Sequence, residues 1–281
     1  MRHAIIMTIY KDKEQVRNFI SNIPKTWDIY IHIDKKSNIS IEEFKYSNVY
    51  VIKKYNIYWG SIFHLKAFLS LLKEAHPKKY DYYHLVTGQD FPCLPLNKFD
   101  SFLGFENKIY IEVHKLPYKG WKAWNYGYSI FKNRTLSRFF DIRKLPYKIL
   151  NKLFVLTSNI INHLELPSYP LYGGVIYSSL TDEAVDFLLN SDFAKSFLDK
   201  LKWSLDGEEL FIQTVLMNSC LSDKVVNDNL RYIDWVSHNG IPETLDESNF
   251  NDITTGRFLF CRKVDSIYSS KLIKRLINYI N

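Results

Sequence analysis

Short runs of apolar, often β-branched residues recur along the first part of the chain and constrain its fold most strongly. Four of them are Ala4–Ile9, Asp28–Asp34, Val49–Ile52 and Tyr82–Val86. Runs of this length and composition are typical of strands that are buried on both faces, as in parallel sheets. Residues 11–20 and 62–75 carry apolar residues at helical spacing between them. The alternation predicts an α/β fold with most of its strands parallel and flanked by helices.

Polar clusters follow two of the predicted strands. Asp34 leads into Lys35-Lys36-Ser37, and the run ending at Val86 is followed by Gly88-Gln89-Asp90 and closed by Pro92. In an open α/β sheet, ligands bind beyond the carboxyl ends of the strands, so such residues are candidate site residues. An ordinary turn, which favours Gly, Asp and Pro, explains each cluster taken alone.

Composition limits the classes of partner and compartment. The net charge of +7 favours anionic partners, namely nucleotide phosphates, nucleic acid or an anionic membrane surface. Cys93, Cys220 and Cys261 lie far apart, which predicts neither a disulfide framework nor a zinc site and suits a reducing compartment. We find neither a signal peptide nor an apolar run long enough to span a bilayer. We therefore expect a cytoplasmic protein, with peripheral attachment to the inner face of the cell membrane as an option.

The second part of the chain combines further strand-like runs with segments rich in basic and apolar residues. Tyr172–Leu180 reads as a strand that begins at paired glycines, and 230–235 and 258–265 read as further strands. Basic and apolar residues interleave over Arg134–Phe154, which favours a helix with basic side chains lying over apolar surface. The alternative is an interfacial segment that faces anionic lipid or an anionic acceptor. Lys271–Ile280 is predicted to be a basic amphipathic helix.

An acidic cluster, Asp206-Gly207-Glu208-Glu209, precedes the apolar run 210–216. Acidic residues favour the first turn of a helix, where the helix dipole and the unpaired N–H groups stabilise them. A carboxylate at a pocket rim is also suited to act as a general base towards a hydroxyl group. Spacing alone leaves both roles open.

Several chemistries lack their motifs in this chain. It has no glycine-rich dinucleotide or P-loop motif, no His/Cys grouping for a transition metal, and no Asp-x-Asp pair of the kind that holds a divalent cation against a nucleotide-sugar diphosphate. A nucleotide-sugar transferase without such a metal needs protein cations to offset the charge on its leaving group. Lys263, with Arg231 or Arg262, is the candidate for that role.

Six segments, each weak alone, together resemble one known family over most of the chain. They are Ile29–Ser37, Tyr58–Ser61, Gly88–Pro92, Gly173-Gly174 with its strand, Glu208–Leu216 and Leu259–Lys263. The chain resembles the core-2/I-branching β-1,6-N-acetylglucosaminyltransferase family, which also contains the peptide O-xylosyltransferases. The resemblance implies a GT-A-type fold, a UDP-sugar donor, inversion at the anomeric carbon and independence from metal.

The resemblance also implies roles for individual residues. Alignment on Thr214 places the catalytic base at Glu209 and puts Glu208 where the family has Asp, and the choice between the two glutamates stays open. Lys263 matches the diphosphate-binding lysine, with Arg231 as the first candidate for its partner arginine. The remaining assignments are Asp34, Asp90, Trp59 and Gly60 on the donor side, and Gly174, Tyr177 and Trp203 towards the acceptor.

These inferences give one functional expectation. A single catalytic domain over 1–281, with a nucleotide-sugar-binding half at about 1–115 and an acceptor-binding, catalytic half at 116–281, transfers GlcNAc or xylose to a glycan hydroxyl. With its low cysteine content and no anchor, the chain resembles a bacterial member of the family. Such a protein is expected to build surface polysaccharide on a glycan or lipid-linked glycan acceptor, and no nucleic-acid partner is expected. The alternative is a non-catalytic protein that binds carbohydrate or nucleic acid through stacked aromatic residues.

Overall fold

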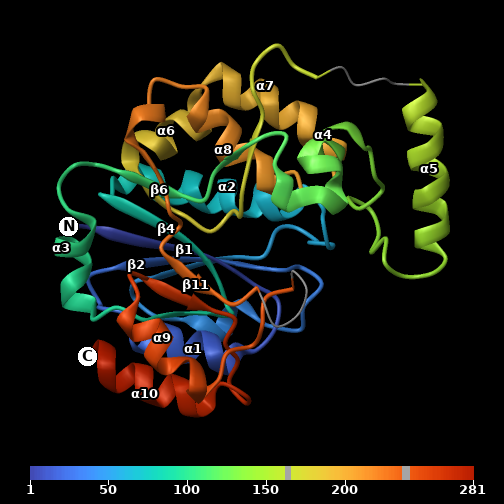
Figure 1. The fold of residues 1–281 in the computed structure, drawn as a ribbon. Coiled ribbons are helices and arrows are strands. Elements are labelled where there is room, and N and C mark those ends of the chain that lie inside the picture. Colours follow the sequence, from blue (N-terminus) through green and yellow to red (C-terminus); the bar gives the residue numbers. More distant parts are fainter. Residues whose placement is uncertain (162–165, 236–240) are drawn as a thin grey trace.

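The computed structural model describes residues 1–161, 166–235 and 241–281, and within these ranges a seven-stranded sheet forms the centre (Figure 1). Its strands, in spatial order, are β10 Val225–Asn227, β6 Ile109–Ile111, β9 Ser179–Thr181, β4 Tyr82–Thr87, β1 His3–Ile9, β2 Asp28–Ile33 and β3 Val49–Ile52. Neighbouring strands are parallel except at β9, which runs antiparallel to both β4 and β6. The predicted α/β fold with a mostly parallel central sheet is confirmed.

Helices cover both faces of the sheet, in the two layers seen in Figure 1. One layer contains α2 Phe63–Ala75, α6 Asp182–Asn190, α7 Asp192–Lys200 and α8 Glu208–Met217, and the other contains α1 Lys13–Ser21, α3 Phe99–Leu103, α9 Phe250–Thr255 and α10 Ser270–Ile280. Side chains alternate along a strand, so in β1 Ala4 and Ile6 pack into the first layer while Ile5 and Met7 pack into the second. Burial on both faces explains why the run is apolar throughout.

A small second sheet joins the C-terminal part to the end of β4. β5 Asp90–Pro92 pairs antiparallel with β12 Phe260–Arg262, which pairs parallel with β11 Arg231–Ile233. The predicted turn after β4 contains Gly88 and Gln89, but its third residue, Asp90, begins β5 instead, because a strand from the far end of the chain pairs with it. The predicted strand Tyr172–Leu180 is also corrected: it divides into β8 Tyr172–Gly173, paired with β7 His114–Lys115, and β9.

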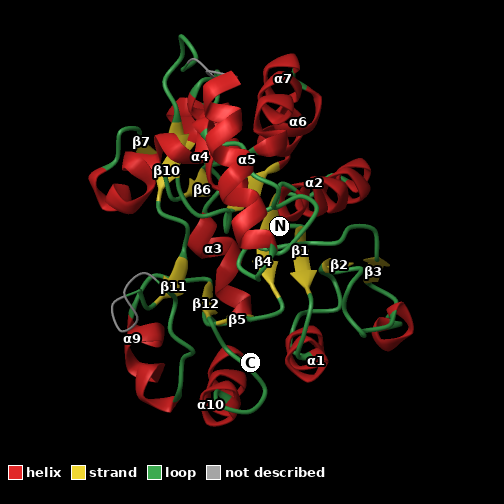
Figure 2. Ribbon diagram, turned by 90° about the vertical axis from the view of Figure 1, so that its right-hand side faces the viewer, coloured by secondary structure: helices red, strands yellow, loops and turns green. Residues whose placement is uncertain are grey.

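Helix α5, Tyr147–Ile161, stands at one side of the molecule and crosses the front of the view in Figure 2. The helix expected over Arg134–Phe154 begins only at Tyr147; α4, Tyr128–Lys132, precedes it. Short 3-10 helices complete the fold at Ile41–Phe44, His76–Lys78, Leu96–Lys98, Lys119–Gly127, Leu201–Trp203, Ser222–Lys224 and Glu247–Asn249. No helix in the described part of the chain has the length and apolarity needed to cross a bilayer.

Candidate active site

The carboxyl ends of β1, β2 and β4 meet at one edge of the central sheet. The backbone N–H groups of Asp34 and Gly88 donate to the carbonyls of Ile9 and Thr8 at 2.8 and 3.0 Å. Asp34 Oδ2 pairs with Lys36 Nζ at 2.5 Å, and its Oδ1 accepts from Lys36 N at 3.0 Å. The Asp34 carboxylate is therefore buried and neutralised within its own loop, where it holds the strand end in shape.

Asp90 and Arg262 lie directly opposite each other in the β5–β12 pair. The fully buried Asp90 carboxylate accepts at Oδ2 from the Thr87 backbone N–H (2.7 Å) and hydroxyl (2.6 Å) and lies 3.5 Å from Arg262 Nη1. Its Oδ1 has no hydrogen-bond partner among the described residues. The Arg262 guanidinium lies 3.5 Å from the centre of the Tyr177 ring, which places an arginine against a phenol at this edge.

Lys263 follows Arg262 and is half-buried. Its pKa is lowered by burial, by the positive charge of Arg262 and by that of Lys11. No carboxylate in the described ranges forms an ion pair with its ammonium group. An ammonium group in such surroundings would be stabilised by an incoming anion.

Arg231 is buried inside the fold, and burial lowers the pKa of its guanidinium to about 10. Its Nη atoms donate to the carbonyls of Leu85, Ser178 and Asn229 and to the hydroxyl of Ser179. These four hydrogen bonds join β4, β9 and β11 and use every Nη hydrogen. The geometry argues against the expected pairing of Lys263 with Arg231 and leaves Arg262 as the arginine beside Lys263.

Three carboxylates gather where α8 begins. Glu208 and Glu209 occupy the first turn, as expected, while the preceding Asp206 adopts a left-handed backbone with φ 52°. Glu208 Oε1 lies 3.2 Å from Nδ1 of His64, whose Nε2 lies 3.1 Å from the Thr8 hydroxyl. The other oxygen, Glu208 Oε2, is buried without a hydrogen-bond partner among the described residues.

Burial and mutual repulsion shift the protonation of this cluster. Burial raises the pKa of Glu209 well above its usual range, and the negative charges of Asp206, Glu208 and Glu112 raise it further. Burial, followed by the charge of Glu208, raises the pKa of Asp206 to about 8. A carboxylate with a raised pKa is a stronger base when ionised, so Glu209 has the electrostatics required of a proton acceptor.

Gly60 connects the predicted donor side to these carboxylates. Its φ of 67° favours glycine, and an added Cβ would come within 2.3 Å of Leu205 Cδ1 and 3.1 Å of Asp206 Oδ1. The Gly60 carbonyl accepts from the backbone N–H of Asp206 at 2.9 Å. The neighbouring Trp59 is 43% exposed, with its ring 5.6 Å from the Arg143 guanidinium. Close packing at Gly60 therefore fixes the backbone of Asp206.

Gly174 positions Glu209 from the other side. Its N–H donates to the Glu209 carbonyl at 2.9 Å, and an added Cβ would come within 2.1 Å of the Glu112 carbonyl. The end of β6 and the first turn of α8 thus both pack closely against Gly174. Paired glycines predict such a close approach to the backbone, because there is no side chain to prevent it.

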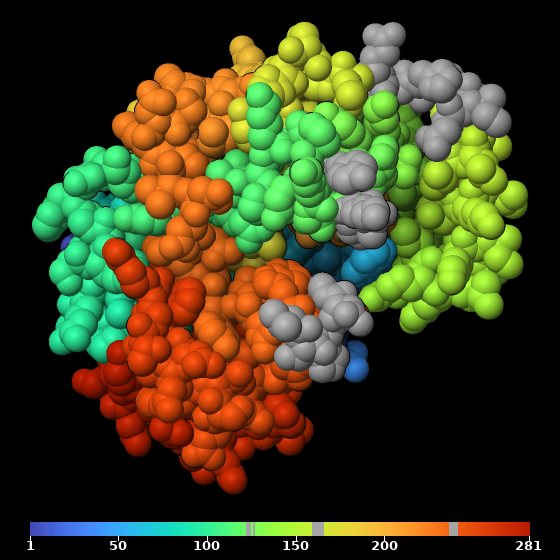
Figure 3. Space-filling view, viewed as in Figure 1, coloured from blue at the N-terminus to red at the C-terminus, as the bar shows by residue number. Residues whose placement is uncertain are grey.

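Tyr177 lies between the cationic and the acidic residues. Burial raises the pKa of its phenol to about 12; the positive charge of Arg262 opposes this shift, and the negative charges of Asp90 and Glu208 add to it. One side chain thus contacts Arg262 and lies within electrostatic reach of Glu208. Figure 3 shows the surface hollowed between α5 and the orange C-terminal segments, with blue atoms from the first quarter of the chain at the floor.

Trp203 contacts the region around α5 rather than the carboxylates. The Arg138 guanidinium lies 4.7 Å from the centre of its ring, and the Phe154 ring of α5 lies 5.9 Å away. We therefore place Trp203 beneath α5, on the approach to the α8 carboxylates.

Two residues of the site were not identified from the sequence. His64 hydrogen-bonds Glu208, and Glu112 contributes to the raised pKa of Glu209. Glu112 directly follows β6, so the rule that strand ends carry site residues would have found it. A lone histidine in the first turn of α2 offers no comparable pattern.

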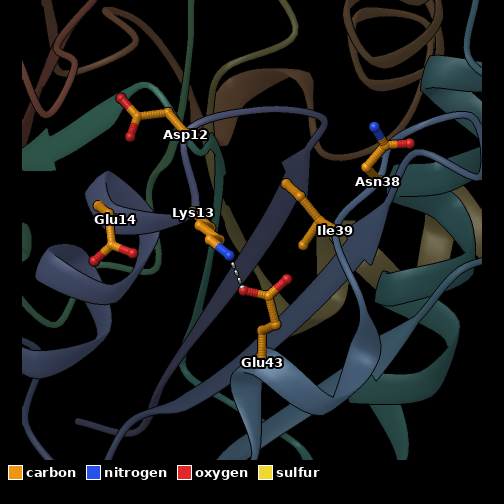
Figure 4. A pocket seen from close by; sticks show the side chains of 6 residues that line it. All are labelled: Asp12, Lys13, Glu14, Asn38, Ile39 and Glu43. Carbon is orange, nitrogen blue, oxygen red and sulfur yellow. Dashed lines mark ion pairs between the residues drawn. The ribbon is translucent and has the colours of Figure 1, made fainter.

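A separate cavity of about 330 Å³ lies beside the ends of β1 and β2 (Figure 4). Its lining residues are Asp12, Lys13, Glu14, Asn38, Ile39 and Glu43. Lys13 Nζ pairs with Glu43 Oε2 at 2.9 Å, as the dashed line in Figure 4 marks. Three carboxylates with one ammonium group, itself already paired, make this cavity unsuited to a diphosphate.

Comparison with known proteins gives matches over most of the chain. The family model of the Core-2/I-Branching enzyme matches residues 6–259. Xylosyltransferase sqv-6 of Caenorhabditis briggsae is 23% identical over 82% of this chain, and that of Caenorhabditis elegans is 22% identical over 82%. The chain spans only 28% of the length of these curated relatives.

A solved structure described as the apo form of the WbbM bifunctional glycosyltransferase aligns with 99% of this chain and 49% of its own, at a TM-score of 0.41 and 10% identity. The match of the family model over residues 6–259 is the decisive one: the chain belongs to the core-2/I-branching enzyme family of glycosyltransferases.

Proposed function

We propose that this protein is an inverting, metal-independent glycosyltransferase that moves a sugar from a UDP-sugar to a hydroxyl group of a glycan acceptor. Glu209 is the general base, and Lys263 with Arg262 binds the diphosphate. Asp34, Asp90, Trp59 and Gly60 shape the donor side. Gly174, Tyr177 and Trp203 lie towards the acceptor.

The position of Tyr177 is the observation on which this proposal rests. The Arg262 guanidinium lies 3.5 Å from the centre of the Tyr177 ring. Burial raises the pKa of its phenol, and the negative charge of Glu208 adds to that shift. One buried phenol therefore contacts the proposed leaving-group cation and senses the charge at the helix end that carries the proposed base, which supports their acting on one substrate. Inverting transfer needs this arrangement, because the attacking hydroxyl and the departing diphosphate lie on opposite faces of the sugar.

The chemistry follows from those positions. Glu209 accepts the proton of the acceptor hydroxyl while that oxygen forms a bond to the anomeric carbon. The bond from the anomeric carbon to the UDP oxygen breaks, and its electron pair leaves with the β-phosphate. Lys263 and Arg262 stabilise the negative charge that grows there, in a partly buried site where such interactions are stronger than in water.

The transferred sugar is proposed to be GlcNAc or xylose. The names of the two nematode relatives favour xylose, and the family resemblance seen in the sequence favours GlcNAc. The acceptor is proposed to be a glycan or lipid-linked glycan of a bacterial surface polysaccharide. UDP-xylose and UDP-GlcNAc therefore come first in a donor screen, ahead of UDP-galactose and UDP-glucose.

Release of UDP, measured with each donor and a panel of glycan acceptors, tests the proposal. We expect one donor to raise the melting temperature of the protein, since a ligand that binds only the folded state stabilises it, and to release UDP faster with acceptor present. Binding of glycans without UDP release from any donor would favour the non-catalytic alternative.

Treatment with EDTA tests the proposed role of Lys263 and Arg262 in place of a metal. Among the described residues, no three or more His, Cys, Asp or Glu side chains are placed so that they could hold a metal ion, and metal independence stays a prediction. We expect transfer to continue within about twofold of its untreated rate, because fixed cations stabilise the leaving group. An absolute requirement for Mn²⁺ or Mg²⁺ would contradict this assignment.

A further inference from the structure

Helix α5 exposes an apolar face that the proposed activity does not use. Leu145, Ile149, Leu153 and Leu156 are 71%, 58%, 57% and 55% exposed. Ile149, Leu153 and Leu156 are spaced by four and three residues and lie along one side of α5, and Leu145 lies in the turn just before the helix. Contiguous exposed leucine and isoleucine side chains of this extent are unusual on a soluble monomer and mark an interaction surface.

The opposite side of α5 is attached to the body of the protein. Asn151 Oδ1 accepts from the Leu136 backbone N–H at 2.8 Å, and Phe154 packs against Trp203. The helix is therefore held in place by its inner side while the apolar residues point away from it. In the space-filling view it forms the yellow-green margin of the molecule (Figure 3).

A row of lysines borders the apolar face. Lys144, Lys148 and Lys152 are exposed and four residues apart, each one position before Leu145, Ile149 and Leu153. The sequence of α5, residues 147–161, contains no Asp or Glu. The nearby Asp141 forms an ion pair with Arg143, at 2.9 Å. No carboxylate in the described part of the chain forms an ion pair with the three lysines.

We propose that α5 docks on the surface of an anionic lipid bilayer, with its leucine face in the headgroup region and Lys144, Lys148 and Lys152 on the lipid phosphates. An apolar face flanked by unpaired lysines is complementary to such a surface. A second copy of the chain is a poorer fit, because it would bring two unneutralised lysine rows together. The proposal does not depend on glycosyl transfer.

Helix α10 offers a natural control, because it was also expected to be basic and amphipathic. Its Leu272, Ile273, Leu276 and Ile280 are buried in the core beneath the sheet. Lys271 and Lys274 remain exposed while the leucine and isoleucine side of α10 faces the core. Membrane contact through α10 would therefore lack a leucine face of the kind that α5 exposes.

Vesicle flotation of the whole chain tests the proposal. The vesicles are phosphatidylcholine alone or phosphatidylcholine with phosphatidylglycerol. We expect binding to the anionic vesicles only. Replacement of Lys144, Lys148 and Lys152 by Gln should weaken it about 100-fold, at about fivefold for each lysine near the surface. Replacement of Leu145, Ile149 and Leu153 by Ser should also reduce binding and should leave the melting temperature unchanged, because these side chains are exposed.

The matched control replaces Lys195, Lys271 and Lys274 by Gln, which removes the same charge from exposed positions elsewhere. We expect this variant to bind as the unmodified protein does. Failure of the unmodified protein to float with anionic vesicles would overturn the proposal, as would equal loss in the control or full binding by the Ser variant. Sedimentation showing a dimer that the Ser variant abolishes, without vesicle binding, would assign the face to self-association instead.

Discussion

The two sides of the proposed site handle charge in different ways. On β12, Arg262 lies near the carboxylate of Asp90 and stacks on Tyr177, and Lys263 beside it carries a lowered pKa. At the start of α8, carboxylates crowd together, and no Lys or Arg of the described ranges forms an ion pair with them. Burial, and then the negative charges of Asp206, Glu208 and Glu112, raise the pKa of Glu209.

This difference shows what each side lacks in the free protein. Among the described residues, Lys263 has no paired anion, and Glu209 has no cation that would offset its negative charge. In the proposed reaction, the UDP-sugar would supply an anion to the first side, and the acceptor hydroxyl would supply a proton to the second. Substrate binding would therefore relieve an electrostatic cost on both sides, with the sugar between them.

Replacement of Glu209 by Gln is expected to have the largest effect. It removes the proton acceptor but keeps the shape of the side chain, so kcat should fall about 10²- to 10⁴-fold while the affinity for UDP-sugar stays the same. Steady-state rates of UDP release and calorimetric titration with UDP measure the two quantities. Glu183→Gln, an exposed glutamate on α6, is the control. Unchanged turnover would move the base to Glu208 or Asp206.

Replacement of Lys263 by Ala comes next. Loss of one preorganised charge at the leaving group should lower kcat about 100-fold, or roughly 3 kcal/mol of transition-state stabilisation. Lys263→Arg should recover part of the rate, since it restores the charge. Lys195→Ala, on the surface of α7, serves as the matched control. Equal rates in the Ala and unmodified proteins would remove the cationic side from the mechanism.

The paired substitutions Arg231→Lys and Arg262→Lys separate a structural arginine from a site arginine. Arg231→Lys should lower the free energy of unfolding by roughly 2–4 kcal/mol, because lysine cannot replace a fork of buried hydrogen bonds. Arg262→Lys should instead reduce the rate about tenfold through a weakened hold on the diphosphate. Chemical denaturation and UDP release measure the two effects. The reverse outcome would restore Arg231 as the partner of Lys263.

The sequence predicted those parts of the molecule that depend on local pattern. The run Ala4–Ile9 identified a buried strand because burial on both faces excludes polar residues. The acidic pair Glu208-Glu209 was predicted to favour the first turn of a helix, and it begins α8, which the Thr214 hydroxyl holds beside the glycine segment by donating to the Tyr172 carbonyl at 2.8 Å. Both elements are recognisable because the pattern that identifies them lies within a few neighbouring residues. The role of Glu209 as the base stays a prediction.

Features that depend on distant partners could not be predicted. Asp90 resembles part of a turn until β12 pairs with β5, and Arg231 and Arg262, both buried, differ in their partners. The same holds for α5 and α10, both basic and amphipathic, of which only α10 finds a core to bury its apolar face. Tertiary contacts decide each of these cases.

Replacement of Asp206 by Asn is expected to have the smallest effect, on stability and its pH dependence. The folded protein retains the Asp206 proton up to about pH 8, whereas an unfolded chain releases it near pH 3.8. Wild-type stability should therefore fall from about pH 4 to about pH 8 as the folded state loses this advantage. Asn cannot ionise and tolerates the left-handed backbone at this position, so the variant should escape that loss.

Melting temperatures of the two proteins across this pH range measure the effect. We expect the melting temperature of the variant to rise relative to that of the wild type as the pH increases, by on the order of 5 °C near pH 8. Asp199→Asn, exposed and paired only with Lys202, is the control and should follow the wild type. Parallel melting profiles for Asp206→Asn and wild type would mean that neither burial nor the charge of Glu208 raises the pKa of Asp206, and the contrast with the cationic side would not hold at this residue.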